Sequence, residues 1–276
     1  MSPDVVHAVA KVGFGAGTND LYDKARPSYP EEALSTLQAA IASKSNIRVL
    51  ELGSGTGIFT RALLAHPTFG PAIKELRAVE PSEGMRDKFA KSTSDSRVSL
   101  SGGTFNHTGS EDGWADLIVV AQAWHWCHPD YNDAILELSR VLKPDGVAAF
   151  IWNLEDREAA RWVARIRDTI EIYENGTPQF RLNFWRQTFS TLAYLEHFKV
   201  PEEHTWSRVI PTTEEGAYNR AFSKSYVAAL GDDEKAVVRT RLRSVLERAE
   251  ERIWIDEASG IFEYPYKTFL VLMHKA

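Results

Sequence analysis

The residues from Val49 to Thr60 constrain the fold of this chain more than any other segment. They read Val-Leu-Glu-Leu-Gly-Ser-Gly-Thr-Gly-Ile-Phe-Thr, an apolar run that contains one acid and passes through three alternating glycines. This pattern predicts a buried β-strand, a tight turn and the start of a helix. In open α/β sheets ligands bind beyond the carboxyl ends of the strands, where glycines let backbone and ligand approach closely. A nucleotide-sized pocket is therefore expected over this turn.

The spacing of the glycines indicates which kind of ligand the loop binds. Gly53, Gly55 and Gly57 are each separated by one residue, whereas dinucleotide sites place their third glycine three residues after the second to accommodate a pyrophosphate. With Glu51 two residues ahead, the loop resembles motif I of the class I S-adenosylmethionine (SAM) methyltransferases. The resemblance implies that Glu51, Gly53, Ser54, Gly55 and Gly57 bind SAM. An incidental tight turn is the alternative.

A second acid follows at the end of the next apolar segment, Glu75-Leu-Arg-Ala-Val-Glu-Pro-Ser-Glu-Gly-Met85. Glu80 lies 23 residues after Gly57, near the ~20-residue offset at which the second strand of a βαβ unit delivers a carboxylate to ribose hydroxyls. The sequence predicts this role for Glu80, with a solvated acid as the alternative. By resemblance, Pro81 and Met85 pack on the adenine, although Met85 could equally fill the core.

Strand and helix signals alternate through the first 152 residues. We expect strands at 47–52, 75–80, 97–101, 115–121 and 147–152, and the last two strands near 198–210 and 261–274. The fold class predicted is α/β, a Rossmann-like doubly wound, mostly parallel seven-stranded sheet with a helical cap inserted before the last strands. The expected organisation is an N-terminal lid segment at 1–30, a SAM-binding core at 31–153, a helical cap at 154–197 with helices at 156–174 and 183–197, and remaining core strands at 198–276 with further cap helices at about 212–252.

The segment Ala121-Gln-Ala-Trp-His-Trp-Cys-His-Pro129 resembles the stretch that type-11 methyltransferases place between cofactor and acceptor. The turn from Arg140 to Gly146 and the segment from Tyr22 to Pro30 are also similar to this family. A weaker likeness in the second half is to fungal-type small-molecule members, including trans-aconitate methyltransferases. The resemblance implies that Gln122 and Ala123 border the cofactor and that Tyr22, Arg26 and Tyr29 act in the lid, with Arg26 pairing either with the SAM carboxylate or with an acidic substrate.

One stretch departs from the family pattern. Many relatives carry an acid after the third strand that binds the adenine amino group, but here the residues are Gly102-Gly-Thr-Phe-Asn106. Thr104 or Phe105 is expected to take over this part of the adenine site.

Catalysis by such a protein depends mainly on positioning, because SAM is already activated. His125 is the candidate general base for a protonated acceptor, since its unperturbed pKa near 6.5 suits that task. The alternative is a wall residue held by a hydrogen bond. No metal site is predicted, because His125 and His128 would point in different directions and no other cluster offers ligands. An aromatic acceptor pocket is expected, with core packing as the alternative for each member: Tyr29, Trp124, Trp126, Trp152, Trp162 and Trp185.

Composition limits the partners. The 276 residues carry a formal charge of -6 and a pI of about 5.8, so no basic stripe is expected for nucleic acid. A single cysteine, Cys127, and the absence of a secretory signal or an 18-residue apolar run favour a cytoplasmic protein without membrane partners. Oligomeric state is left open.

The predicted function is SAM-dependent methylation of a small organic molecule, with O-methylation of a carboxylate or hydroxyl favoured and S-adenosylhomocysteine (SAH) as the second product. The alternative is a SAM-binding protein of the same fold that binds a ligand or catalyses a rearrangement without moving a methyl group.

Overall fold

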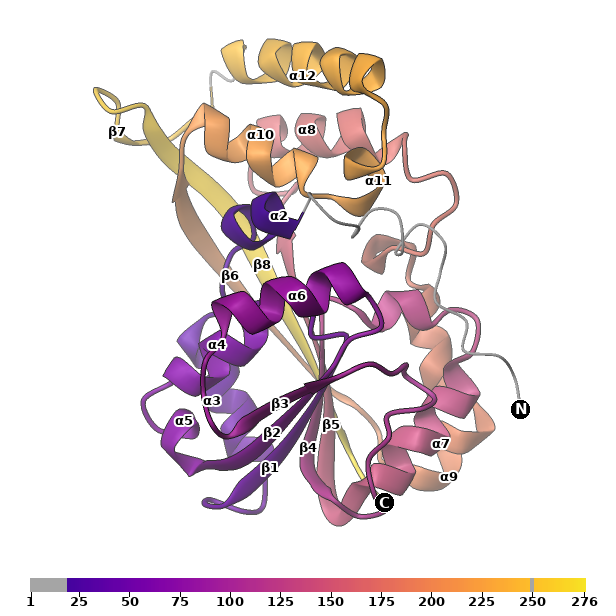
Figure 1. The fold of residues 1–276 in the computed structure, drawn as a ribbon. Helices are drawn as coiled ribbons and strands as arrows, with labels where there is room; N and C mark the ends of the chain where they lie inside the picture. Colours follow the sequence, from indigo (N-terminus) through magenta and orange to yellow (C-terminus); the bar gives the residue numbers. More distant parts are fainter. Residues whose placement is uncertain (1–18, 249–250) are drawn as a thin grey trace.

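A central sheet of eight strands organises the computed structural model, which describes residues 19–248 and 251–276. The main path runs β3-β2-β1-β4-β5-β8-β6, and the short β7 pairs with β8 (Figure 1). The strands are β1 (Ile47–Leu52), β2 (Ile73–Val79), β3 (Val98–Ser101), β4 (Ala115–Ala121), β5 (Leu142–Glu155), β6 (Glu202–Thr212), β7 (Trp254–Asp256) and β8 (Ile261–His274). Strands β1 to β5 pair in parallel, whereas β8 is antiparallel to β5 and β6.

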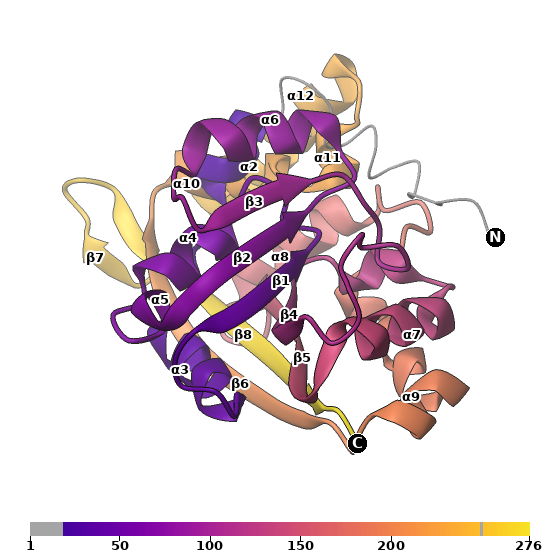
Figure 2. The same cartoon turned by 60° about the horizontal axis from the view of Figure 1, so that its bottom comes forward.

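Helices cover both faces of this sheet (Figure 2). On one face lie α3 (Glu31–Ala40), α4 (Ile58–Ala65), α5 (Phe69–Ala72) and α6 (Glu83–Ser92), whose apolar side chains share a core cluster with β1 and β2. On the other face lie α7 (Tyr131–Val141), the 3-10 helix η3 (Phe184–Ser190) and α9 (Leu192–His197). All seven residues of β4 are buried, as expected for a strand with helices on both sides.

A further group of helices forms a separate apolar cluster at one end of the sheet. It comprises α8 (Arg161–Glu171), α10 (Glu214–Phe222), α11 (Ser225–Ala228) and α12 (Asp232–Glu247), and we call it the cap. Its apolar cluster includes Trp162 from α8 and Phe262, Tyr264 and Tyr266 from the first half of β8. The cap therefore packs on the first half of the long strand β8, as Figure 1 shows.

The lid predicted at 1–30 is described only in part, because residues 1–18 lie outside the described residues. Its second half forms α2 (Asn19–Ala25) and the connection to α3. Helix α2 lies between the cap and α6. Figure 1 shows it above the carboxyl ends of the core strands.

The predicted fold class is confirmed, with three local corrections. The prediction of a single helix at 183–197 is wrong. The segment contains η2 (Phe180–Leu182), η3 and α9 instead, and Asn183 between η2 and η3 has a φ of 58°, which ends a helix. These residues pack on α7 beside the sheet, because Trp185 and Tyr194 belong to the core cluster there. The turn expected at 143–146 is a bulge within β5, where the pairing with β4 skips from Leu142 to Val147. The eighth strand, β7, was not predicted.

Candidate active site

A cavity of about 290 Å³ lies at the carboxyl ends of β1, β2 and β4; we call it the main cavity. Loops after four successive strands of the sheet meet there, as the sheet order requires. Predicted residues that line it are Tyr22, Gly53, Gly55, Glu80, Pro81, Met85, Thr104, Phe105, Gln122, Ala123 and Trp126.

The glycine loop has the left-handed backbone that its residues allow. Gly53, Gly55 and Gly57 have φ values of 68°, 56° and 84°, a region that disfavours side chains. A Cβ on Gly53 would lie 2.7 Å from the Cβ of Ala123, so this glycine lets the loops after β1 and β4 touch. A Cβ on Gly55 would meet nothing within 4 Å and would occupy open space beside the cavity.

Gly57 is the one motif glycine that lines none of the three cavities described here. It caps α4, and a Cβ there would lie 2.8 Å from the Thr93 hydroxyl and 2.9 Å from the Phe89 ring. In this structure Gly57 shapes the turn and lets α4 pack against α6, and its predicted contact with the cofactor stays a prediction.

Glu80 presents a buried carboxylate to the main cavity. Its Oε2 accepts a hydrogen bond from the Gly55 amide at 3.0 Å and its Oε1 accepts one from the Ser82 amide at 2.8 Å. Burial raises the pKa of Glu80, and these backbone donors act in the opposite direction. Each oxygen keeps a lone pair, so the carboxylate can accept hydroxyl donors from a ligand.

A smaller pocket of about 30 Å³ lies on the other side of the glycine loop; we call it the motif pocket. Glu51 lines it, and its Oε2 accepts a hydrogen bond from the Thr60 hydroxyl while Oε1 is buried without a partner. The hydroxyl of Ser54, also in this pocket, is buried and unpartnered too. Burial raises the pKa of Glu51 to about 8. An unsatisfied carboxylate oxygen in a pocket indicates a site for a cationic or hydrogen-bond-donating ligand group.

A third cavity of about 50 Å³ lies between the cap and the ends of β4 and β5; we call it the cap cavity. It is lined by Tyr22, Arg26, Gln122, His125, Trp126, Trp152, Leu154, Arg167, Gln179, Phe180, Arg181, Lys224, Ser225 and Tyr226. Tyr22 and Gln122 are the two residues that border all three cavities. Gln122 has a φ of 60° and donates through Nε2 to the Asn153 carbonyl at 2.7 Å. The junction of the cavities therefore lies beside these two side chains.

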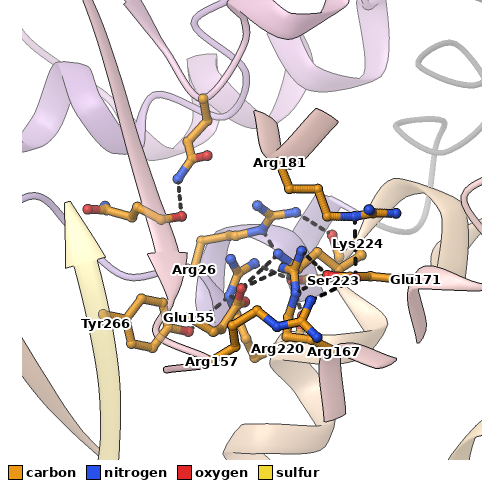
Figure 3. Close-up of polar contacts among 12 residues, drawn as sticks. Arg26, Glu155, Arg157, Arg167, Glu171, Arg181, Arg220, Ser223, Lys224 and Tyr266 are labelled. Carbon is orange, nitrogen blue, oxygen red and sulfur yellow. Dashed lines mark hydrogen bonds and ion pairs between the residues drawn. The ribbon is translucent and has the colours of Figure 1, made fainter. Parts of the chain in front are cut away.

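The lid residues divide between the cavities. Arg26 borders the motif pocket and the cap cavity, and its guanidinium donates to the Ser223 hydroxyl at 3.2 Å and the Ser223 carbonyl at 2.9 Å (Figure 3). The guanidinium also lies 4.4 Å from the centre of the Tyr22 ring. Tyr29 lines the motif pocket and packs edge-on against Phe59. Arg26 is therefore hydrogen-bonded to the cap and also lines the cap cavity.

His125 lines the cap cavity within the 3-10 helix η1 (Trp124–Cys127). Its Nδ1 accepts a hydrogen bond from Nε1 of Trp152 at 3.4 Å. Burial lowers the pKa of His125 to about 3, with Arg26 and Lys224 adding to the effect. The ring is neutral at physiological pH. Since Nδ1 accepts, Nε2 carries the proton and is a donor.

The predicted aromatic pocket is only partly assembled. Trp126 lines the main and cap cavities and Trp152 lines the cap cavity. Trp124, Trp162 and Trp185 line none of the three cavities. Trp124 and Trp185 belong to the core beside α7, and Trp162 belongs to the cap core. Their indole groups bury large apolar areas where helices pack, which is the commoner use of tryptophan.

Several cavity residues were not predicted. Asn106 lines the main cavity beside Thr104, whose hydroxyl donates to its Oδ1 at 2.7 Å. The charged residues Arg167, Arg181 and Lys224 of the cap cavity were missed too, because each lies in a segment whose sequence pattern indicates a surface helix or loop. The number of arginine and lysine residues in the cap is the one feature of the sequence that could have indicated these cavity residues.

The donor set fits SAM. Glu80 can accept from two ribose hydroxyls, Asn106 offers an amide at the far end of the main cavity, and the unpartnered Oε1 of Glu51 can take an ammonium. Gly55 lines both the main cavity and the motif pocket, and a Cβ there would occupy open space.

The described residues offer neither a metal site nor a membrane-spanning helix. No group of three or more His, Cys, Asp or Glu side chains there is arranged to hold a metal ion. None of the helices in the same part of the chain has the length and apolar character needed to cross a bilayer.

Part of this chain matches a known protein family. Residues 50–150 match the family described as "Methyltransferase domain", type 11. The chain is 35% identical over 159 residues to an uncharacterized methyltransferase of Mycobacterium tuberculosis, which covers 58% of this chain and 59% of that protein. It is 28% identical over 227 residues to an uncharacterized methyltransferase-like protein of Schizosaccharomyces pombe, with 81% and 82% covered.

Solved structures agree on the fold. A protein from Anaeromyxobacter dehalogenans described as a type II methyltransferase has a TM-score of 0.60 at 19% identity, covering 90% of this chain and 97% of its own. The YcgJ protein of Bacillus subtilis has a TM-score of 0.54 at 19% identity, covering 89% and 99%. Residues 50–150 of this chain therefore match the type-11 methyltransferase domain family, and the solved structures share the fold.

Proposed function

We propose that this protein transfers a methyl group from SAM to a carboxylate oxygen of a small organic acid. The observation that carries the proposal is the junction of the three cavities at Tyr22 and Gln122, where the main cavity meets a cavity lined by basic side chains. When bound, SAM supplies a methyl group on a sulfonium, which reacts with an in-line nucleophile.

Three groups of this chain would hold the cofactor. Glu80 would accept the ribose hydroxyls, and Asn106 would meet the adenine edge in place of the acid that relatives carry after the third strand. Glu51 would accept the ammonium through Oε1, with the Ser54 hydroxyl beside it. With these groups on either side, the methyl donor would lie near the junction at Gln122.

The state of His125 favours a carboxylate over a hydroxyl acceptor. A histidine whose pKa is lowered to about 3 removes a proton from an alcohol poorly at neutral pH. A carboxylate arrives already ionised and needs no base. We propose that His125 donates through Nε2 to the acceptor and so orients it.

The first prediction separates the cofactor site from the fold. Gly55→Ala should lower SAH affinity at least about tenfold, because the added methyl group enters the main cavity, while left-handed strain costs about 1–2 kcal/mol of stability. Gly260→Ala is the matched control, since Gly260 has a φ of 67°, similar open space and a position in the β7–β8 turn. Calorimetry with SAH and urea unfolding measure both effects. Equal SAH affinity in the two variants would contradict the proposed site.

Glu51 gives a prediction about pH. Its raised pKa means that the free protein holds this carboxyl mostly protonated at pH 7, whereas an ammonium ligand favours the carboxylate. SAH affinity should therefore rise between about pH 6 and 8, and binding at pH 7 should release a proton, measurable by calorimetry in buffers of different ionisation enthalpy. Glu51→Gln should abolish the release and weaken binding. Binding without proton release in the wild type would count against this role.

The same pKa shift has a consequence for stability. A carboxyl with a raised pKa in the folded state loses its stabilising contribution as pH rises through the folded pKa, here about 8. Glu51→Gln is accordingly expected to unfold at higher urea concentration than the wild type at about pH 9.

The experiment that tests the function uses SAM labelled in its methyl group with panels of carboxylic acids, phenols and amines. Labelled, base-labile methyl esters are expected from acids. SAM binding with no labelled product from any panel would favour the ligand-binding or rearrangement alternative.

His125 can be tested with the acid identified in that way. We expect His125→Ala to lower turnover by about tenfold or less, to leave SAH affinity near the wild-type value, and the wild-type rate to show no inflection between about pH 5.5 and 7.5. A hundredfold loss together with an inflection near pH 6.5 would instead make His125 a general base.

A further inference from the structure

Basic side chains outnumber acidic side chains around the cap cavity. Arg26, Arg167, Arg181 and Lys224 line it, and no carboxylate is among its lining residues. The carboxylates that pair with these side chains, among them Glu155 and Glu171, do not line the cavity, and Figure 3 shows their contacts. The cations therefore present their charge to the cavity.

The ion pairs can be counted among the described residues. Arg157, Arg167, Arg181, Arg220 and Lys224 share the carboxylates Glu155, Asp168, Glu171 and Glu174. Arg26 has no carboxylate within ion-pair distance in this part of the chain, and its partner is the neutral Ser223. The group therefore contains six basic side chains and four carboxylates.

Glu155 is the most crowded of these acids. It is buried, and Arg220, Arg167 and Lys224 lie 2.6, 2.8 and 3.0 Å from its oxygens. Burial and the neighbouring charges of Arg167 and Arg220 lower the pKa of Lys224 well below its usual value, so its ammonium form is disfavoured unless an anion joins Glu155 beside it. Buried charge without a counterion is costly, so this arrangement favours an additional anion.

Tyr226 is the second indication of a ligand. Its side chain lines the cap cavity, and its hydroxyl is buried without a hydrogen-bond partner. A buried hydroxyl normally has a partner. The free hydroxyl and the cations point to an oxygen-rich anion in this space.

The size of the cavity limits what enters it. About 50 Å³ accommodates a few water-sized groups, because one water occupies about 10–15 Å³ by the same measure. The space suits one carboxylate or phosphate group. The rest of an acceptor would extend past His125 and Trp126 toward the junction at Gln122.

We propose that the cap cavity is an oxyanion site that holds a second, unreacted acidic group of the acceptor, either a carboxylate or a phosphate. The favoured acceptors are then small compounds with at least two acidic groups, one held by Lys224, Arg167 and Arg26 and the other methylated. The statement about the acceptor rests on the proposed function, whereas oxyanion binding itself does not.

The test measures binding rather than turnover. The full-length protein is titrated by calorimetry, with and without saturating SAH, with malonate, succinate and glutarate, with acetate, propionate and butyrate, and with inorganic phosphate. At least one dicarboxylate, or phosphate, should bind about tenfold or more tightly than any monocarboxylate. A response to phosphate alone assigns the group as phosphate, and a response to dicarboxylates assigns it as carboxylate.

Variants locate the site. Lys224→Met should weaken binding of the preferred anion by about ten- to a hundredfold and Tyr226→Phe by about tenfold, since each removes a donor to a charged group. Lys224→Met should not lower the unfolding temperature, because it relieves repulsion with Arg167 and Arg220. Tyr226→Phe changes no charge and little volume, so it tests the site even if the lysine variant folds poorly. The control is Arg157→Gln, which belongs to the same network but does not line the cavity.

The outcomes are distinct. If SAH binds but dianions bind no better than monocarboxylates, or if Lys224→Met and Tyr226→Phe bind them as the wild type does, the oxyanion site is wrong and the proposed methyl transfer stands. If dianions bind as expected but SAH does not, the proposed function fails and the oxyanion site stands.

Discussion

Replacing Glu155 by glutamine is expected to lower the free energy of unfolding by about 3–5 kcal/mol at pH 7, because the substitution leaves buried cations without their counterion. Burial alone would raise the pKa of Glu155, but Arg220, Lys224 and Arg167 together outweigh it and hold the pKa well below its usual value. A carboxylate with a lowered pKa stabilises the folded state above its unfolded pKa and loses that contribution as pH falls through the folded pKa. The difference between variant and wild type should therefore shrink in strong acid.

Urea unfolding followed by circular dichroism measures this effect. The control is Glu158→Gln, because Glu158 is exposed and its ion pair with Lys267 spans 2.7 Å at the surface. We expect the control to lie within about 1 kcal/mol of the wild type. A Glu155 variant as stable as this control would show that the cation cluster does not depend on its central carboxylate.

Replacing Glu80 by alanine is expected to weaken SAM and SAH binding by about ten- to a hundredfold with any acceptor, since it removes charge-assisted hydrogen bonds worth about 1.5–3 kcal/mol. The loss should appear in calorimetry with SAH alone. Glu80→Gln, which keeps an oxygen to accept from the Gly55 amide, separates the charge from the support that Glu80 gives to the glycine loop.

Two comparisons make the Glu80 result specific. Asp87→Ala removes an exposed acid from the adjacent helix α6 and should leave SAH affinity unchanged. His125→Ala should also leave it near the wild-type value, because His125 lines the cap cavity and not the main cavity. Equal loss in the Glu80 and His125 variants would place His125 beside the cofactor, and wild-type affinity in Glu80→Ala would remove Glu80 from the site.

The sequence by itself determined the sheet and most of the predicted residues that line the main cavity. Those features depend on residues close together along the chain: a strand such as β4 is an apolar run of seven, and Gly53, Gly55 and Glu80 each directly follow a strand or sit in the turn after it. Parallel strands then bring their carboxyl ends to one edge, which gathers these residues without further information.

Only the tertiary structure decided which residues line the cap cavity. Arg26, Glu155, Arg167 and Lys224 lie on four different segments, and each resembles an ordinary surface residue in its local pattern. The same limit explains the tryptophans, because periodicity does not distinguish the wall of a cavity, where Trp152 lies, from a packed interface, where Trp185 lies. Charge pairing and burial act between segments distant in sequence, so the fold of the cap against β5 and β8 had to be known before the anion site could be recognised.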